Sequence, residues 1–177
     1  MKYFVILIAL AAAMLSFSVM SDNPVKTEAV ITNKTVTQAA IIVKDIDKAR
    51  TEWAKVLGVD IPGVSIAENN RARPTQYRGN PSAAEAKLAF FNMGNLQIEL
   101  IQPLGGKSTW QELIDTKGEG LHHIAFAVKD INGMEKKFEV LGMPTVQSGG
   151  WNGGAYSYID ASAQLGCILE LLENYEN

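Results

Sequence analysis

Residues 38–58 read QAAIIVKDIDKARTEWAKVLG, and residues 123–142 read HIAFAVKDINGMEKKFEVLG. Each stretch opens with an apolar run that ends in Val-Lys-Asp-Ile, continues at helical spacing and closes in Val-Leu-Gly. The two copies begin at positions 38 and 123, an offset of 85 residues. Internal repetition of this length indicates one structural unit used twice. The pair therefore predicts a strand followed by a helix, present in two copies.

Both copies carry suitable residues at the two ends of the expected helix. Asp45 and Asp130 precede the helices, where a short acceptor side chain satisfies free backbone N–H groups. Gly58 and Gly142 follow them, where a helix favours a residue in the left-handed conformation. The sequence thus predicts where each helix begins and ends.

The second half of each copy predicts further strands. Residues 87–92 and 95–102 read as a hairpin, and residues 155–160 lead into a closing strand in the other copy. The closing strands, LQIELIQ and CILELLE, each hold one glutamate among large apolar residues: Glu99 and Glu170. A charged side chain is unusual in such a setting because carboxylates are rarely buried unless paired.

The first 21 residues differ in character from the rest. Lys2 is followed by an apolar run over residues 4–15 and by a small-residue site that ends at Ser21. This order is typical of a secretory signal peptide, so residues 1–21 predict export to a periplasm or to the medium. An uncleaved N-terminal membrane anchor is the alternative, because the run approaches the length that spans a bilayer.

The remaining composition is that of an ordinary folded domain. The chain has 177 residues, is 47% hydrophobic and 20% charged, and carries a net charge of −3. That balance argues against a nucleic-acid partner, which requires a basic face. No later segment is apolar enough for a membrane span, so none is expected after signal cleavage. The single cysteine, Cys167, cannot form a disulfide within the chain.

Strand alternation places several of these residues on common faces. Gln38 and Ala40 share one face of the first strand, and His123 and Ala125 share one face of its counterpart. The small alanines leave a hollow, and two copies packed about a pseudo-twofold axis would bring together one ligand-type residue from each of four strands. These residues are Gln38, Glu99, His123 and Glu170. His122 is expected to face the other way and to be structural.

The combination favours a metal site. Two buried carboxylates without a counter-charge repel each other, and a divalent cation relieves that repulsion. Imidazole, carboxylate and amide oxygen suit zinc, nickel, cobalt, iron or manganese. A lone histidine is more often structural and a strand-start glutamine more often lies at the surface, but the repeated glutamate favours one divalent metal ion.

Two segments are candidates for a lid over the hollow. Residues 62–86 form the longer internal connection of the first copy and include Arg71, Arg73 and Arg78. Such a connection is either a functional lid or a solvated linker. Residues 149–154, Gly-Gly-Trp-Asn-Gly-Gly, are the second candidate.

The sequence resembles the vicinal oxygen chelate superfamily of glyoxalases, methylmalonyl-CoA epimerases, extradiol dioxygenases and bleomycin-resistance proteins, with the epimerase and glyoxalase-like members most similar. Four stretches carry the resemblance: residues 39–49, 91–106, 118–131 and 165–173. It implies an α+β fold over residues 35–175, in which two βαβββ modules pair into a curved mixed sheet that cups one site. Module one would cover residues 35–104 and module two residues 119–175.

The resemblance also implies an activity. It predicts an isomerase or lyase that uses a divalent metal at Gln38, Glu99, His123 and Glu170 to stabilise the enolate of a small carbonyl substrate. Glu170 or Glu99 would be the base that abstracts the α-proton. Gln38 departs from the histidine usual in epimerases and is similar to the residue in some glyoxalase I enzymes. No clear carboxylate stands at Leu88 or Ala89, where some epimerases carry a base; Glu85 is nearby but is expected to lie in the loop.

Two other readings stay open at the level of sequence. The first is a non-catalytic small-molecule binding protein of the bleomycin-resistance type, favoured by the predicted export and by Gln38. The second, extradiol ring cleavage, is weaker because a second ligand histidine is missing from the set. The sequence does not decide between a monomer and a homodimer.

Overall fold

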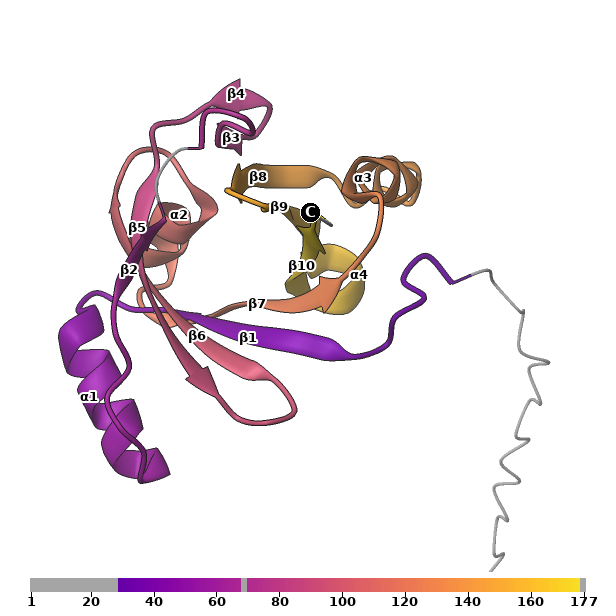
Figure 1. Ribbon diagram of the computed structural model, residues 1–177. Helices are drawn as coiled ribbons and strands as arrows, with labels where there is room; N and C mark the ends of the chain where they lie inside the picture. The colour runs from indigo at the N-terminus through magenta and orange to yellow at the C-terminus, as the bar shows by residue number, and fades with distance from the viewer. Residues whose placement is uncertain (1–28, 68–69, 176–177) are drawn as a thin grey trace, which may run out of the picture.

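The computed structural model describes residues 29–67 and 70–175, so the predicted signal peptide lies outside the described residues. Ten strands form one mixed sheet in the order β2-β5-β6-β1-β7-β10-β9-β8-β3-β4. Figure 1 shows this sheet strongly curled, with α1 and α3 outside the curl. The α+β fold with a curved mixed sheet is the one that the sequence predicts.

The first copy supplies both edges of the sheet: β2, β5, β6 and β1 are its first four strands in spatial order, and β3 and β4 are its last two. Its elements are β1 (Val36–Ile42), α1 (Ile46–Leu57), β2 (Ser65–Ala67), β3 (Gln76–Tyr77), β4 (Asn80–Pro81), β5 (Glu85–Asn92) and β6 (Gln97–Gly105). A connecting helix, α2 (Thr109–Thr116), leads to the second copy. The second copy comprises β7 (Gly120–Ala127), α3 (Ile131–Val140), β8 (Thr145–Trp151), β9 (Gly154–Ala161), α4 (Ser162–Leu165) and β10 (Cys167–Asn174).

The strand registers reveal the symmetry of the two copies. In the parallel pair of β1 and β6, Ala40 lies opposite Glu99. In the parallel pair of β7 and β10, Ala125 lies opposite Glu170. Each alanine stands two residues after the equivalent residue of its strand, Gln38 or His123. The antiparallel pairing of β1 with β7 joins the copies at the middle of the sheet.

The helix ends follow the sequence prediction. Asp45 accepts a hydrogen bond from the backbone N of Lys48, and Asp130 accepts one from the backbone N of Gly133. Gly58 and Gly142 both have positive φ angles, 68° and 74°. These caps fix the path from each central strand into its helix, so that both helices return along the outer face of the sheet (Figure 1).

Apolar side chains form three clusters that hold the curl. One cluster packs α1 against β5 and β6, and a second packs α3 against β9 and β10. The third lies inside the curl and includes Trp110 from α2 and Tyr158 from β9. Because both faces of the central strands are packed, the strands are held rigidly. Side chains on rigid strands keep a fixed geometry, which a functional site requires.

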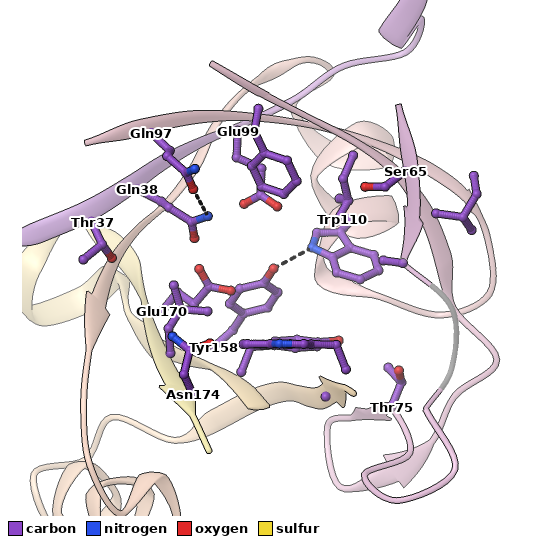
Figure 2. A pocket seen from close by; sticks show the side chains of 18 of the residues that line it. Thr37, Gln38, Ser65, Thr75, Gln97, Glu99, Trp110, Tyr158, Glu170 and Asn174 are labelled. Atoms are coloured by element: carbon purple, nitrogen blue, oxygen red, sulfur yellow. Dashed lines mark hydrogen bonds between the residues drawn. The ribbon is translucent and has the colours of Figure 1, made fainter. Parts of the chain in front are cut away.

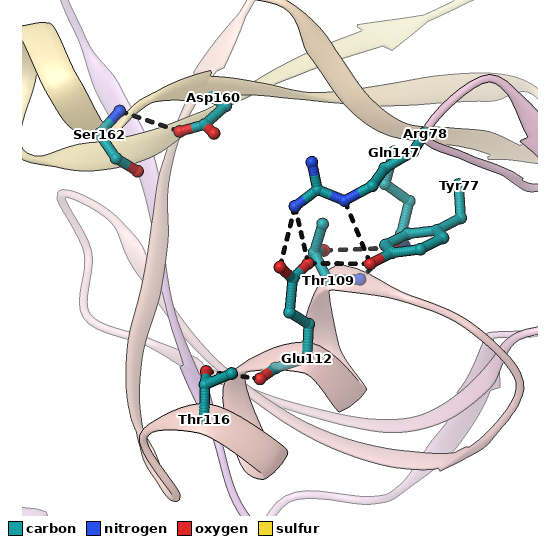
Figure 3. Close-up of polar contacts among 8 residues, drawn as sticks. All are labelled: Tyr77, Arg78, Thr109, Glu112, Thr116, Gln147, Asp160 and Ser162. Atoms are coloured by element: carbon teal, nitrogen blue, oxygen red, sulfur yellow. Dashed lines mark hydrogen bonds and ion pairs between the residues drawn. The ribbon is translucent and has the colours of Figure 1, made fainter.

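The long connection of residues 62–86 is part of the sheet. Its strand β3 pairs with β8 at the far edge, so its described residues continue the curl on that side. Arg78 forms an ion pair with Glu112 of α2 at 2.9 Å, and the Tyr77 hydroxyl donates to the same carboxylate (Figure 3). These short strands depend on tertiary partners, and residues of the segment, among them Thr75 and Ala84, line the cavity described below. The role of the segment as a lid stays a prediction.

The second lid candidate is a paired part of the sheet, and its role as a lid stays a prediction. Residues 149–154 lie in a β-hairpin, because β8 ends at Trp151 and β9 begins at Gly154. Ladder partners satisfy the backbone of Gly149 and Gly150, which pair with Tyr156 and Ala155. Glycine at position 149 lets the Tyr156 ring lie against the backbone, since a Cβ on Gly149 would lie 2.7 Å from that ring.

Gly106 holds the end of β6 close to the segment that precedes β5. Its φ is +76°, and a Cβ there would lie 2.7 Å from the backbone N and Cα of Ala84. Gly106→Ala is expected to lower the free energy of unfolding by about 3 kcal/mol or more, because strain and a backbone clash add. Urea denaturation measures the loss.

Gly118→Ala is the matched control. Gly118 has a similar φ of +83°, but a Cβ there would meet no atom within 4 Å. Only the backbone strain of about 1–2 kcal/mol should remain. Equal losses in the two variants would contradict the close approach of the chain at Gly106.

No helix among residues 29–67 and 70–175 combines the length and the apolar character needed to cross a membrane.

Candidate metal centre in the curled sheet

The four residues singled out from the sequence lie on four neighbouring strands. Glu99 is on β6, Gln38 on β1, His123 on β7 and Glu170 on β10, and these strands are consecutive in the sheet. Register partners share a face, so Glu99, Ala40 and His123 point to one side. The fully buried alanines leave the space that the longer side chains occupy.

Three of the four converge at the bottom of the hollow. His123 Nε2 lies 3.0 Å from Glu170 Oε2 and 3.6 Å from Glu99 Oε2. One ligand atom from each residue lies within 4.8 Å of the others. All three side chains are buried, with relative exposures of 6% or less. Figure 2 shows the Glu99 and Glu170 carboxylates pointing toward each other across the cavity.

This arrangement fits a divalent metal ion. His123 Nε2 and Glu170 Oε2 are buried and have no hydrogen-bond partner in the described part of the chain, although they lie close together. Unpaired buried polar atoms are costly and call for a missing partner. Donor atoms about 2.1 Å from a common ion lie between about 3.0 and 4.2 Å apart, so the two measured separations suit shared ligation. The donor set of nitrogen and oxygen suits borderline divalent ions.

Gln38 lies beside this group as a further oxygen donor. Its Nε2 donates a hydrogen bond of 3.2 Å to Gln97 Oε1. With the nitrogen engaged there, the amide oxygen is turned into the cavity that Glu99 and Glu170 also line (Figure 2). The structure thus brings Gln38 to the same cavity; its role as a ligand stays a prediction.

The pKa values of Glu99 and His123 are both raised above their usual values, for different reasons. Burial raises the pKa of Glu99, and the charge of Glu170 adds to the rise. Burial alone would lower the pKa of His123, but the neighbouring carboxylates, Glu170 first, outweigh it and raise that pKa to about 9. Without a metal, a proton on His123 therefore supplies the positive charge that the two glutamates require.

His122 corrects the expectation drawn from strand alternation. The register of β7 against β1 shifts between His123 and Leu121, so His122 sits at a β-bulge. A bulge breaks the alternation of faces, and the Nδ1 atoms of the two histidines lie 2.8 Å apart. Burial, together with the charge on His123, lowers the pKa of His122 well below its usual value. His122 is thus a neutral partner that orients the His123 ring.

The cavity above these residues has a volume of about 530 Å³. Sequence reasoning missed its aromatic wall, which includes Trp110, Tyr156 and Tyr158. The Trp110 indole N–H donates to the Tyr158 hydroxyl at 3.1 Å, and the Tyr158 ring lies 4.8 Å from that of His123. Tyr158 could have been found from the pairing of β9 with β10, because it is the cross-strand partner of Glu170.

The raised pKa of His123 predicts how the metal-free protein responds to pH. The folded-state pKa of about 9 exceeds the unfolded value of 6.5, so the stabilisation is fully present below pH 6.5 and is lost as the pH rises through 9. EDTA-treated protein should lose about 2–3 kcal/mol of unfolding free energy over that window. Urea denaturation at pH 6, 7.5 and 9 measures it. A metal-free His123→Asn variant should vary far less over the window; an equal slope in both proteins would refute the assignment.

Comparison with known proteins places this geometry in context. A family model described as the Glyoxalase/Bleomycin resistance protein/Dioxygenase superfamily matches residues 37–159. The uncharacterized protein YqjC of Bacillus subtilis is 29% identical over 139 residues, which cover 75% of this chain and 87% of that protein. Mitochondrial methylmalonyl-CoA epimerase of Bos taurus is 32% identical over 108 residues, 58% of this chain and 54% of the relative. The chain therefore spans about half the length of the bovine epimerase.

Solved structures agree on the fold. Methylmalonyl-CoA epimerase from Mycobacterium tuberculosis superposes with a TM-score of 0.57 at 20% identity, covering 85% of this chain and 95% of that chain. The Streptomyces coelicolor methylmalonyl-CoA epimerase in complex with 2-nitronate-propionyl-CoA gives a TM-score of 0.58 at 16% identity, covering 82% and 100%. At these identities the likeness concerns the fold, and it confirms the fold that the sequence predicts.

Proposed function

This chain belongs to the glyoxalase/bleomycin resistance protein/dioxygenase superfamily, and on that premise we propose that it is a divalent-metal-dependent, epimerase-like enzyme. Its substrate is a small carbonyl compound that exchanges an α-proton. The observation that carries the proposal is the convergence of the buried side chains of His123, Glu99 and Glu170 at the bottom of the cavity, with His123 Nε2 only 3.0 Å from Glu170 Oε2.

His123, Glu99 and Glu170 would hold the ion, with the Gln38 oxygen as the fourth donor. A divalent ion in this place polarises a carbonyl group and stabilises the negative charge that develops when the α-proton leaves. The side chains of His123, Glu99 and Glu170 are buried, which strengthens electrostatic interactions at that end of the cavity. His122 orients the His123 ring through the contact of their Nδ1 atoms.

The two glutamates are suited to moving the proton. They reach the cavity from β6 and β10, which flank the central pair of β1 and β7 on opposite sides. One carboxylate oxygen takes the α-proton, and the other carboxyl group can return a proton to the opposite face of the same carbon. Burial raises the pKa of Glu99 above its usual value, which favours its protonated form more than in an exposed glutamate.

Two measurements test the proposal together. Elemental analysis of the purified protein should find about one equivalent of a transition metal per chain. Incubation with small α-hydroxy ketones or α-substituted thioesters in deuterium oxide should place deuterium at the α-carbon, as seen by NMR. Metal binding and ligand binding without exchange of any tested compound would refute the enzyme and favour a non-catalytic binding protein.

We also propose export of the chain, on the pattern of residues 1–21. Intact-mass analysis of protein recovered from the extracytoplasmic fraction should give a mass that corresponds to removal of about 21 residues. Recovery of the uncleaved chain in the membrane fraction would favour the anchor instead.

A further inference from the structure

The chemistry of the cavity lining bears on what can enter it. Twenty described residues line the cavity, and none of them is lysine, arginine or histidine. The lining contains two carboxylates, Glu99 and Glu170. A bound divalent cation would balance those two charges and leave the interior with no net positive charge. An anionic group held against the apolar walls, away from the ion, would lose its hydration with no cationic side chain in the described lining to pair with, which is costly.

One arginine runs close to the cavity but is engaged elsewhere. The stem of Arg73 lies beside Gly150, which lines the cavity, since a Cβ on Gly150 would be 3.0 Å from Arg73 Cβ. Its guanidinium turns to Glu135 of α3, with an Nη2–Oε1 distance of 3.0 Å. It also donates to Asn132 Oδ1 at 3.3 Å. Arg73 is therefore neutralised outside the cavity.

The walls of the cavity offer flat apolar surfaces. Trp110 and Tyr156 are stacked, with ring centroids 6.3 Å apart and an interplanar angle of 29°. Phe90, Trp151 and Tyr158 also line the cavity. Aromatic faces favour planar apolar groups over branched or charged ones. The carboxylates of Glu99 and Glu170 and the amide of Gln38 lie at one end of the cavity (Figure 2).

From these observations we infer that the cavity accepts the uncharged, planar end of a carbonyl compound, such as an aryl ketone, and discriminates against a ligand that carries a carboxylate on that planar end. The inference rests on the proposed function, because it names the substrate class of the same site. The carbonyl oxygen would lie at the end where Glu99, Glu170 and Gln38 would hold the ion, and the ring would lie against Trp110 and Tyr156. A volume of about 530 Å³ accommodates such a compound whole.

The test compares two probes of one shape and different charge. Isothermal titration calorimetry measures binding of 2-hydroxyacetophenone and of its para-carboxylate to the metal-loaded protein. The uncharged probe should bind at least about 10-fold more tightly, because the carboxylate is desolvated without a partner. Equal or tighter binding of the carboxylate, tighter binding of methylmalonyl-CoA, or no binding of the uncharged probe would each overturn the inference.

Substitutions of cavity-lining residues test whether the cavity wall causes this difference in binding. Trp151→Leu should weaken binding of the uncharged probe about 3- to 10-fold, whereas Trp53→Leu, on α1 beside Phe91, should leave it unchanged. Ile66 lines the cavity at a 46% exposed position, and Ile66→Lys should strengthen carboxylate binding about 3- to 5-fold. A Trp53 variant that loses binding as much as the Trp151 variant would count against an aromatic wall.

Deuterium exchange separates this inference from the proposed function. If 2-hydroxyacetophenone binds more tightly than its para-carboxylate but no tested compound exchanges its α-proton, the proposed activity is refuted and the inferred ligand class is supported. If methylmalonyl-CoA binds more tightly and exchanges its α-proton, the activity stands and the inferred ligand class falls.

Discussion

Glu170→Gln and Glu99→Gln variants are expected to exchange the α-proton of a carbonyl substrate at least about 100-fold more slowly than the parent protein. Glutamine keeps the size of the side chain and one oxygen donor but cannot accept a proton at neutral pH. Both carboxylates face the same cavity and lie close to His123 Nε2. The change therefore removes the base while leaving the shape of the site in place. The exchange rate is measured by NMR in deuterium oxide.

Two checks make the result interpretable. Metal content is determined for each variant, so that a slow rate is not the result of an empty site. Glu85→Gln serves as the matched control, because Glu85 begins β5 in an exposed position and should change the rate less than about 2-fold. Exchange at the parent rate in both cavity variants, with metal retained, would remove the glutamates from the mechanism.

The second large effect concerns the ion itself. His123→Ala is expected to reduce the metal content from about one equivalent to almost none, because the remaining oxygen donors lack the nitrogen ligand and leave a gap. His123 is fully buried, and its Nε2 is the atom closest to both carboxylates. Elemental analysis after dialysis, together with a zinc titration, measures the loss.

His122→Phe provides the comparison for this variant. His122 contacts His123 through Nδ1 atoms 2.8 Å apart, and phenylalanine removes that contact while keeping a ring in its place. Metal affinity should fall only about 10- to 100-fold, as expected for a residue that orients a ligand. If His122→Phe abolished binding and His123→Ala did not, the assignment of the two histidines would be reversed.

The repeat allowed much of the site to be predicted. Because Glu99 and Glu170 occupy equivalent places in closing strands, strand alternation alone directs both toward one hollow, and their convergence follows from the symmetry of the sheet. The helix starts after Asp45 and Asp130 could also be predicted from the sequence, because capping is a local interaction.

The remaining features depend on contacts that no local pattern contains. The bulge at His122 arises from the register of two strands that come from different copies of the repeat. The two-residue strands β3 and β4 form only against β8 and against each other. Trp110 reaches the cavity from the helix between the copies, and its position is set by Tyr158, 48 residues later.

The pairing of equivalent positions has a stereochemical consequence. Two identical copies would surround a ligand with identical groups on both sides of the axis, and the ligand could bind equally well in two orientations related by a half-turn. Glu99 and Glu170 preserve that equivalence, but Gln38 and His123 do not, because an amide and an imidazole differ in charge and donor strength. The difference at this one pair makes the two orientations unequal, so a prochiral or chiral ligand presents a defined face to each glutamate.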